Sequence, residues 1–230
     1  MSCNHPVCLA CHDSDEDGLA LCPVCKKLKN LEVGHVEVEK VPLEDVGSER
    51  GLRARIIETL KLIVFNPAEL YRRMLPSKSL VYPLTFGYVC ACIGLGLGAI
   101  WQIVFEMPGL EEQREVVAEL GLPAGVADVI MVVTVPLQAV FYIVINALIL
   151  HLSARLVGGR APAAKTFQLY AYSCGVLLLN VVPMIGVFAS LFMQISAQFV
   201  GLRIVHKLTL GRAMLACAIP LAFLSVVGGF

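Results

Sequence analysis

The chain has 230 residues, of which 57% are apolar and 16% are charged, and its mean hydropathy of +0.77 lies above the range of soluble domains. Its 18 basic and 18 acidic residues cancel to a formal charge of zero. This composition predicts an integral membrane protein and excludes a globally basic protein that binds nucleic acid.

Charge is concentrated at the start of the chain. Residues 1–79 hold 11 of the 18 basic and 12 of the 18 acidic residues. Residues 1–29 contain no apolar core of the kind that a cleavable signal peptide needs, so we expect this segment to stay in the cytoplasm. The predicted domains are a zinc-ribbon-like head and linker, amphipathic interfacial helices, and a five-span membrane domain, at 1–46, 47–78 and 79–230.

Two CxxC pairs, separated by ten residues, lie in the head. Their cysteines are Cys8, Cys11, Cys22 and Cys25. The two thiolates of each pair can converge on one tetrahedral ion, and such an ion stabilises a short segment that has little core. The sequence therefore predicts one structural Zn²⁺ per chain. It leaves open whether Cys3, His5 or His12 replaces one of the four ligands.

Two other interpretations of these cysteines compete with structural zinc. Cys8 to His12 also fits CxxCH, the attachment pattern of c-type haem, but that attachment is expected outside the cytoplasm. A CxxC pair can also be a redox dithiol, because its geometry lowers a thiol pKa. The second pair favours a metal, since a redox dithiol needs no partner ten residues away.

Residues 31–39 show a weak strand pattern or form a linker, and helical spacing of apolar residues begins after Ser48, a good N-cap. Asn66 is predicted to cap a second short helix, with Pro67 at its first position. Basic residues expected at the membrane surface lie on both helices: Arg50, Arg53, Arg55, Lys61, Arg72 and Arg73.

The segment from Ser48 to Lys78 carries a net charge of +4. Each basic residue near an anionic leaflet contributes about 1 kcal/mol of attraction. We therefore expect the two helices to lie on the cytoplasmic face of the bilayer, near anionic lipid. Simple packing against the cytoplasmic ends of the spans is compatible with this.

The predicted membrane spans follow uncharged windows, because about 20 apolar residues are needed to cross about 30 Å of hydrocarbon. The first window is 79–105 and the second is 129–154, with Pro136 as a kink. The window 166–202 is long enough for two spans joined by a turn at Pro183 and Gly186. A fifth span occupies 213–230.

Basic residues alternate between the loops. Arg155, Arg160 and Lys165 follow the second span, and Arg203, Lys207 and Arg212 follow the fourth, whereas the loops after the first and third spans are acidic or uncharged apart from Arg114. Because lysine and arginine stay on the cytoplasmic side, we predict a cytoplasmic amino terminus and an external carboxyl terminus. In a prokaryote this would be the cytoplasmic membrane.

Polar residues within the spans are few. The second predicted span carries Gln138 and Asn146, and the fourth carries Gln194 and Gln198. Hydrogen bonds between helices account for such residues without a ligand, so they are weak candidates for a site. The sequence contains no HExxH, GxSxG or Walker motif, and we expect no enzyme activity.

Several segments together resemble the Yip (Ypt/Rab-interacting protein) membrane domain. They are FNPAELYRRML at 65–75, LHLSARLVGG at 150–159, TFQLYAYSCG at 166–175, the turn at Pro183 and Gly186, and GLRIVHKLTLGRAMLACAIP at 201–220. The resemblance implies an all-α bundle of five transmembrane helices with a cytoplasmic amino terminus. For eukaryotic relatives it also implies binding to prenylated small GTPases, but their Asp-Leu-Tyr-Gly-Pro segment is absent here.

The leading hypothesis is therefore a multi-pass membrane scaffold or adaptor, whose zinc-binding head and basic helices dock protein partners or anionic lipid. A small-solute transporter or channel that uses the polar faces of the second and fourth spans is the alternative. A redox or zinc sensor is a third hypothesis. No functional residue is carried over from the family.

Overall fold

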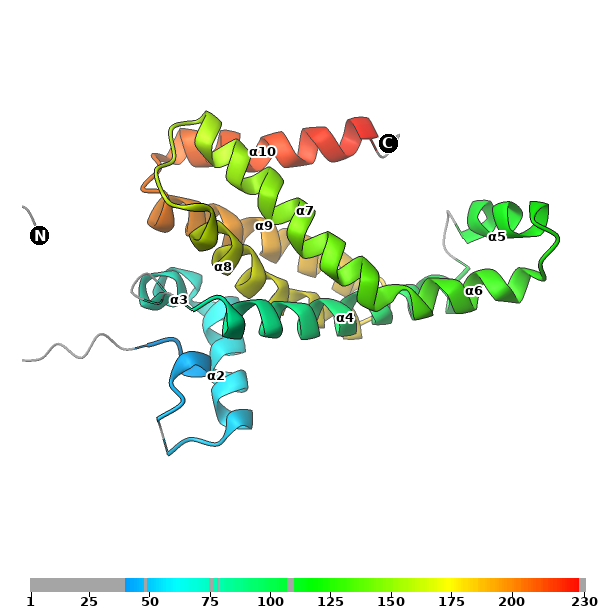
Figure 1. The fold of residues 1–230 in the computed structure, drawn as a ribbon, viewed down its shortest axis with the longest axis horizontal. Helices are drawn as coiled ribbons and strands as arrows, with labels where there is room; N and C mark the ends of the chain where they lie inside the picture. Colours follow the sequence, from blue (N-terminus) through cyan, green and yellow to red (C-terminus); the bar gives the residue numbers. More distant parts are fainter. Residues whose placement is uncertain (1–39, 48, 75–76, 78, 107–109, 228–230) are drawn as a thin grey trace, which may run out of the picture. The chain divides into compact units, whose positions relative to one another are not determined.

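The computed structural model describes residues 40–47, 49–74, 77, 79–106 and 110–227. The chain divides into two units, 1–39 and 40–230, and only the second is described here. Its described residues are helical, without strands (Figure 1). The four predicted zinc ligands and the strand pattern at 31–39 lie outside the described residues.

The described residues form nine α-helices and two 3-10 helices, numbered as in Figure 1. In chain order they are η2 (Pro42–Glu44), α2 (Leu52–Phe65), α3 (Pro67–Met74), α4 (Val81–Val104), α5 (Leu110–Glu119), α6 (Ala124–Val133), α7 (Val135–Leu156), α8 (Ala163–Ser173), η3 (Cys174–Val181), α9 (Ile185–Val205) and α10 (Leu210–Val227).

The two short helices before the first span are present. The backbone N–H of Glu69 donates to Asn66 Oδ1 at 3.3 Å, so Asn66 caps α3 as predicted, with Pro67 as the first helical residue. The start predicted for α2 is wrong, because α2 begins at Leu52 with Gly51 at its N-cap.

Within the described ranges, three helices are long and apolar enough to cross a membrane, judged by length and composition: α4, α7 and α9. Large apolar side chains are exposed along α7 and α9, among them Leu137, Phe141, Leu148, Leu152, Phe188 and Phe192. Exposure on this scale is unfavourable in water and is what lipid-facing helices require. The structure thus agrees with an integral membrane protein.

The second predicted span is divided at Thr134 into α6 and α7, so the kink lies two residues before the predicted position. Pro136 occupies the second position of α7, where its missing N–H would have had no helical partner. Arg114 of α5 forms two hydrogen bonds with the Asp128 carboxylate, at 3.1 and 3.0 Å, and so joins α5 to α6.

The long window 166–202 folds back on itself at the predicted turn. The chain passes from α8 into η3 without interruption, turns at 182–184, and enters α9. Gly186 is essential to this turn, since a Cβ atom there would lie 2.1 Å from the carbonyl oxygen of Leu179. Met184 in the turn has a φ of 60°, which is uncommon for a residue other than glycine.

The core includes the short helices as well as the apolar ones. Tyr71 and Met74 of α3 are fully buried, and Ile63 of α2 is 1% exposed. The three side chains belong to the same buried cluster as residues of α4, α7, α8 and η3. The helices α2 and α3 are therefore packed parts of the bundle.

Candidate functional site

A cavity of about 180 Å³ lies among α7, α8, α9 and α10. We call it the interhelical cavity. Its polar lining comes from Tyr142, Asn146, Tyr170, Gln194 and Gln198. Three of the four polar residues singled out from the sequence, Asn146, Gln194 and Gln198, are thus brought to one place.

Two tyrosines and one glutamine form a hydrogen-bonded group in the wall of this cavity. The hydroxyl of Tyr142 donates to Gln194 Oε1 at 2.8 Å, and Gln194 Nε2 donates to the hydroxyl of Tyr170 at 3.4 Å. The two tyrosine rings are 5.9 Å apart. The group connects α7, α8 and α9, and sequence analysis missed Tyr170 because no pattern within α8 distinguishes it.

Asn146 uses its amide nitrogen locally, donating to the carbonyl of Tyr142 one turn earlier at 2.8 Å. Pro220 also lines the cavity and lies inside α10. Because proline has no N–H, the carbonyl of Ala216 loses its regular helical partner there. Amide, phenol and carbonyl groups, all uncharged, therefore surround the cavity, which suits a small neutral molecule or water.

Gln138 does not reach the interhelical cavity. Its Nε2 donates to Thr134 Oγ1 at 2.8 Å, within its own chain segment. Gln138 lines a different cavity of about 760 Å³, together with Trp101 and Asn180. The two predicted polar residues of α7, Gln138 and Asn146, thus line two different cavities.

Asn180 joins three segments and was not predicted to do so. Its Nδ2 donates to the carbonyl of Gly94 at 3.0 Å, and its Oδ1 accepts from Ser190 Oγ at 2.8 Å. Trp101 Nε1 donates to the Asn180 carbonyl at 2.7 Å. These bonds hold η3 against α4 and α9, and they account for Asn180 by helix packing alone.

Two histidines share one hydroxyl near the start of α8. Thr166 Oγ1 lies 2.9 Å from His151 Nδ1 and 2.9 Å from His206 Nε2. His206 is 2% exposed, and its Nδ1 has no hydrogen-bond partner within the described residues. Burial, followed by the nearby His151 and Arg155, lowers the pKa of His206 to about 4. His206 is therefore neutral at physiological pH.

Lys165 fastens the end of α3 to α8. Its Nζ donates to the carbonyl of Met74 at 3.1 Å, to the carbonyl of Ser77, and to Gln168 Oε1 at 3.0 Å. A cation is favourable at the C-terminal end of a helix, where carbonyl groups are unpaired. The basic helices are thus tied to the membrane domain by a side chain.

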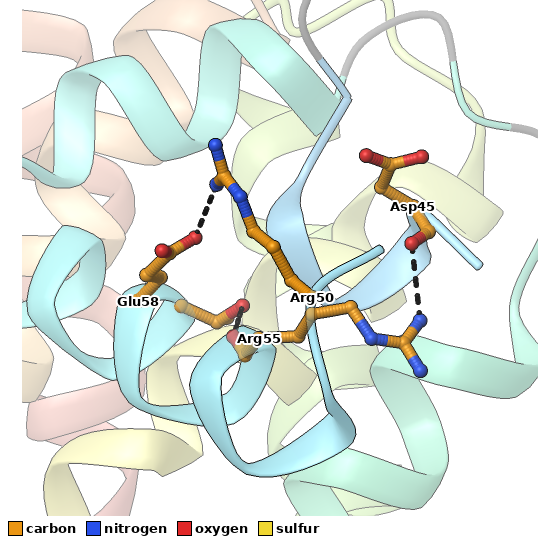
Figure 2. A network of polar contacts seen from close by, with 5 residues as sticks. Asp45, Arg50, Arg55 and Glu58 are labelled. Atoms are coloured by element: carbon orange, nitrogen blue, oxygen red, sulfur yellow. Dashed lines mark hydrogen bonds and ion pairs between the residues drawn. The ribbon is translucent and has the colours of Figure 1, made fainter. Parts of the chain in front are cut away.

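The six predicted surface cations have different environments. Arg50 pairs with Glu58 at 2.7 Å, and Arg55 donates to the carbonyl of Asp45 at 3.2 Å (Figure 2). Arg73 Nε lies 2.9 Å from Glu69 Oε1. Arg53 and Lys61 are exposed, and the exposed Arg72 has one guanidinium nitrogen 3.9 Å from Glu69 Oε2.

Among the described residues, no group of three or more histidine, cysteine or acidic side chains is placed to hold a metal ion. The predicted zinc ligands of the head are not among these residues.

Comparison with known proteins identifies the membrane domain. The model of the Yip1 domain matches residues 61–230, which is well over half of the chain. The chain belongs to the Yip1 domain family. This confirms the resemblance found in the sequence and, with the three long apolar helices, identifies an integral membrane protein. No curated protein and no solved structure matches the chain significantly.

The interhelical cavity and the histidine pair both lie inside the Yip1 domain, whereas the CxxC head precedes it.

Proposed function

We propose that this protein is a multi-pass membrane adaptor of the Yip-domain type, with a cytoplasmic zinc-binding head that docks protein partners or lipid. One observation carries this proposal. The helices α2 and α3 are held to the bundle by buried side chains and by Lys165, yet they keep Arg53, Lys61 and Arg72 at the surface. A basic platform that follows the head along the chain is suited to docking.

The proposed arrangement has five spans, an amino terminus in the cytoplasm and a carboxyl terminus outside. In chain order the five proposed spans are α4, α7, the α8–η3 segment, α9 and α10. The loops after α7 and after α9 carry the basic residues, which supports this orientation. The proposed role is docking without catalysis, in keeping with a sequence that contains no HExxH, GxSxG or Walker motif.

The head is proposed to hold one Zn²⁺ on Cys8, Cys11, Cys22 and Cys25. Four thiolates at this spacing form a closed structural site, which leaves no open position for catalysis. Metal analysis of the purified chain should find one zinc per protein, lost on Cys22→Ser. Cys92→Ser, which changes a half-buried cysteine of α4, is the matched control and should keep the metal. Zinc that survives Cys22→Ser would contradict the ligand assignment.

Docking is tested by affinity capture from detergent-solubilised membranes. Proteins bound by the intact chain should be lost with Cys22→Ser and retained with Cys92→Ser. A set of partners unchanged by Cys22→Ser would refute a role for the head in docking.

The interhelical cavity favours a second candidate function, the passage of small neutral solutes. Its volume of about 180 Å³ exceeds the roughly 150 Å³ that admits benzene in an engineered cavity. Glycerol flux into proteoliposomes should then fall with Asn146→Ala and Gln194→Ala. Gln138→Ala, which removes an amide outside this cavity, is the control. Flux equal to that of empty liposomes would reject transport and leave the adaptor proposal intact.

A further inference from the structure

The outward side of α2 carries a ridge in which basic and apolar side chains alternate. Its members are spaced four residues apart and therefore share one helical face: Arg53, Ile57, Lys61 and Phe65. We call them the outer ridge. All four are exposed, Ile57 by 52% and Phe65 by 83%.

The opposite side of α2 packs against the bundle. Thr59 is fully buried and Ile63 is 1% exposed. Ile63 lies close to Gly175: a Cβ atom built on Gly175 would be 2.7 Å from the Cδ1 atom of Ile63. Because the helix cannot turn without opening this contact, the outer ridge stays uncovered by the described part of the chain.

The direction of α2 suits a position at the membrane surface. It runs crosswise to α4 and extends past it on the side away from α7 and α10 (Figure 1). A helix that lies crosswise to a spanning helix lies along the plane of the bilayer. Since α4 begins at Val81, soon after α3, this plane is at the end of the bundle that carries the basic residues.

The charge of this face selects the kind of partner. The outer ridge contains two cations and no acidic residue, and the neighbouring Glu58 is already paired with Arg50. Interfacial helices at an anionic leaflet combine Lys and Arg with large apolar residues, and the long stems of Lys and Arg let the charged ends reach headgroups beside an inserted apolar side chain. An aromatic residue exposed to water gains most from such an environment.

We propose that the outer ridge inserts into the cytoplasmic leaflet, with Phe65 among the acyl chains and Arg53 and Lys61 against anionic headgroups. This inference rests on the cytoplasmic placement of α2 in the proposed function, and it specifies which side chains meet lipid.

Trp101 is the single tryptophan of the chain, so a unique fluorescent probe can be placed on the ridge. Phe65→Trp is introduced into a Trp101→Phe background, and the full chain is reconstituted in vesicles that contain phosphatidylglycerol and brominated lipid. The tryptophan at position 65 should be quenched by the brominated chains and shielded from aqueous iodide. Val46→Trp in the same background is the control, because Val46 is 58% exposed but lies before α2.

Charge dependence provides the second measurement. Replacing phosphatidylglycerol by phosphatidylcholine should reduce the bromolipid quenching, and so should Arg53→Gln with Lys61→Gln. Each lost charge should lower the inserted-to-exposed ratio about fivefold.

Three results would overturn the proposal. The first is iodide access and bromolipid quenching at position 65 that match those at position 46. The second is quenching that is independent of lipid charge. The third is shielding of position 65 only after addition of a solubilised partner protein, which would favour protein docking. Capture through the cysteine head is measured separately with Cys22→Ser, so either proposal can fail alone.

Discussion

Tyr71 and Tyr172 are both fully buried, but their hydroxyl groups have opposite environments. The hydroxyl of Tyr71 has no hydrogen-bond partner among the described residues, whereas that of Tyr172 donates to Glu44 Oε1 at 2.6 Å. A hydrogen bond to a charged group contributes about 1.5–3 kcal/mol, and a buried group without a partner only costs desolvation.

Thermal unfolding in detergent should separate these two residues. Tyr172→Phe should lower the free energy of unfolding by about 1.5–3 kcal/mol, while Tyr71→Phe should leave it unchanged or raise it. Both changes remove one oxygen atom, so each is the control for the other. A loss with Tyr71→Phe as large as that with Tyr172→Phe would mean that the Tyr71 hydroxyl has a partner.

The lowered pKa of His206 predicts that the folded protein loses stability in acid. Its pKa is about 4 in the folded protein, whereas the ordinary pKa of histidine is 6.5, so the unfolded chain binds the proton first as pH falls. Stability should therefore decrease between about pH 6.5 and pH 4, and this contribution should be constant below that range. His206→Gln, compared by unfolding temperature across these pH values, should flatten the dependence. An equal acid slope in the variant would assign it to other groups.

At the scale of single residues, the sequence identified the cavity amides but not their partners. Asn146, Gln194 and Gln198 could be found because polar residues are rare within uncharged windows. Tyr170 and Asn180 could not, since their roles depend on which helices become neighbours, and periodicity within one helix carries no such information.

At the scale of helices, α4 approaches α8 closely at a glycine. A Cβ atom on Gly87 would lie 2.6 Å from the carbonyl oxygen of Ala171, on α8, whereas one on Gly96 would have no neighbour closer than 3.9 Å. The backbone of α8 cannot move aside as the end of a side chain can.

The two glycines therefore provide a matched pair. Gly87→Ala should reduce the free energy of unfolding by about 1–3 kcal/mol through overpacking. Gly96→Ala should be neutral or should stabilise the helix by up to about 1 kcal/mol, because alanine is the better helix former. Unfolding in detergent measures both. If Gly87→Ala were as stable as Gly96→Ala, α4 and α8 would not be in backbone contact.

Prediction of whole elements succeeded where composition changes abruptly. The limits predicted for the first span, 79–105, lie within two residues of α4, and the turn at Pro183 and Gly186 is confirmed. The break at Thr134 escaped prediction because apolar residues continue through it. The start of α2 was misplaced because a good capping residue, Ser48, precedes the true N-cap by three positions.

For the molecule as a whole, the arrangement of the spans is the main prediction. An alkaline phosphatase reporter joined after Phe230 should be active, since the proposed carboxyl terminus is external. Thiol labelling of sealed cells should fail to reach Cys22. A cytoplasmic reporter would exclude five spans, and external labelling of Cys22 would reopen the haem interpretation of the head.

The change from α8 to η3 affects how far this segment reaches. Its 11 α-helical and 8 3-10 residues extend about 32 Å, against about 28 Å if all were α-helical, because a 3-10 helix rises more per residue. In the five-span arrangement, this length lets a segment of only nineteen residues span the usual hydrocarbon thickness of about 30 Å. A thinner bilayer would favour rewinding to α-helix, which would turn Asn180 away from Gly94 and Ser190. Lipid chain length should therefore act on the contacts that hold this segment in place.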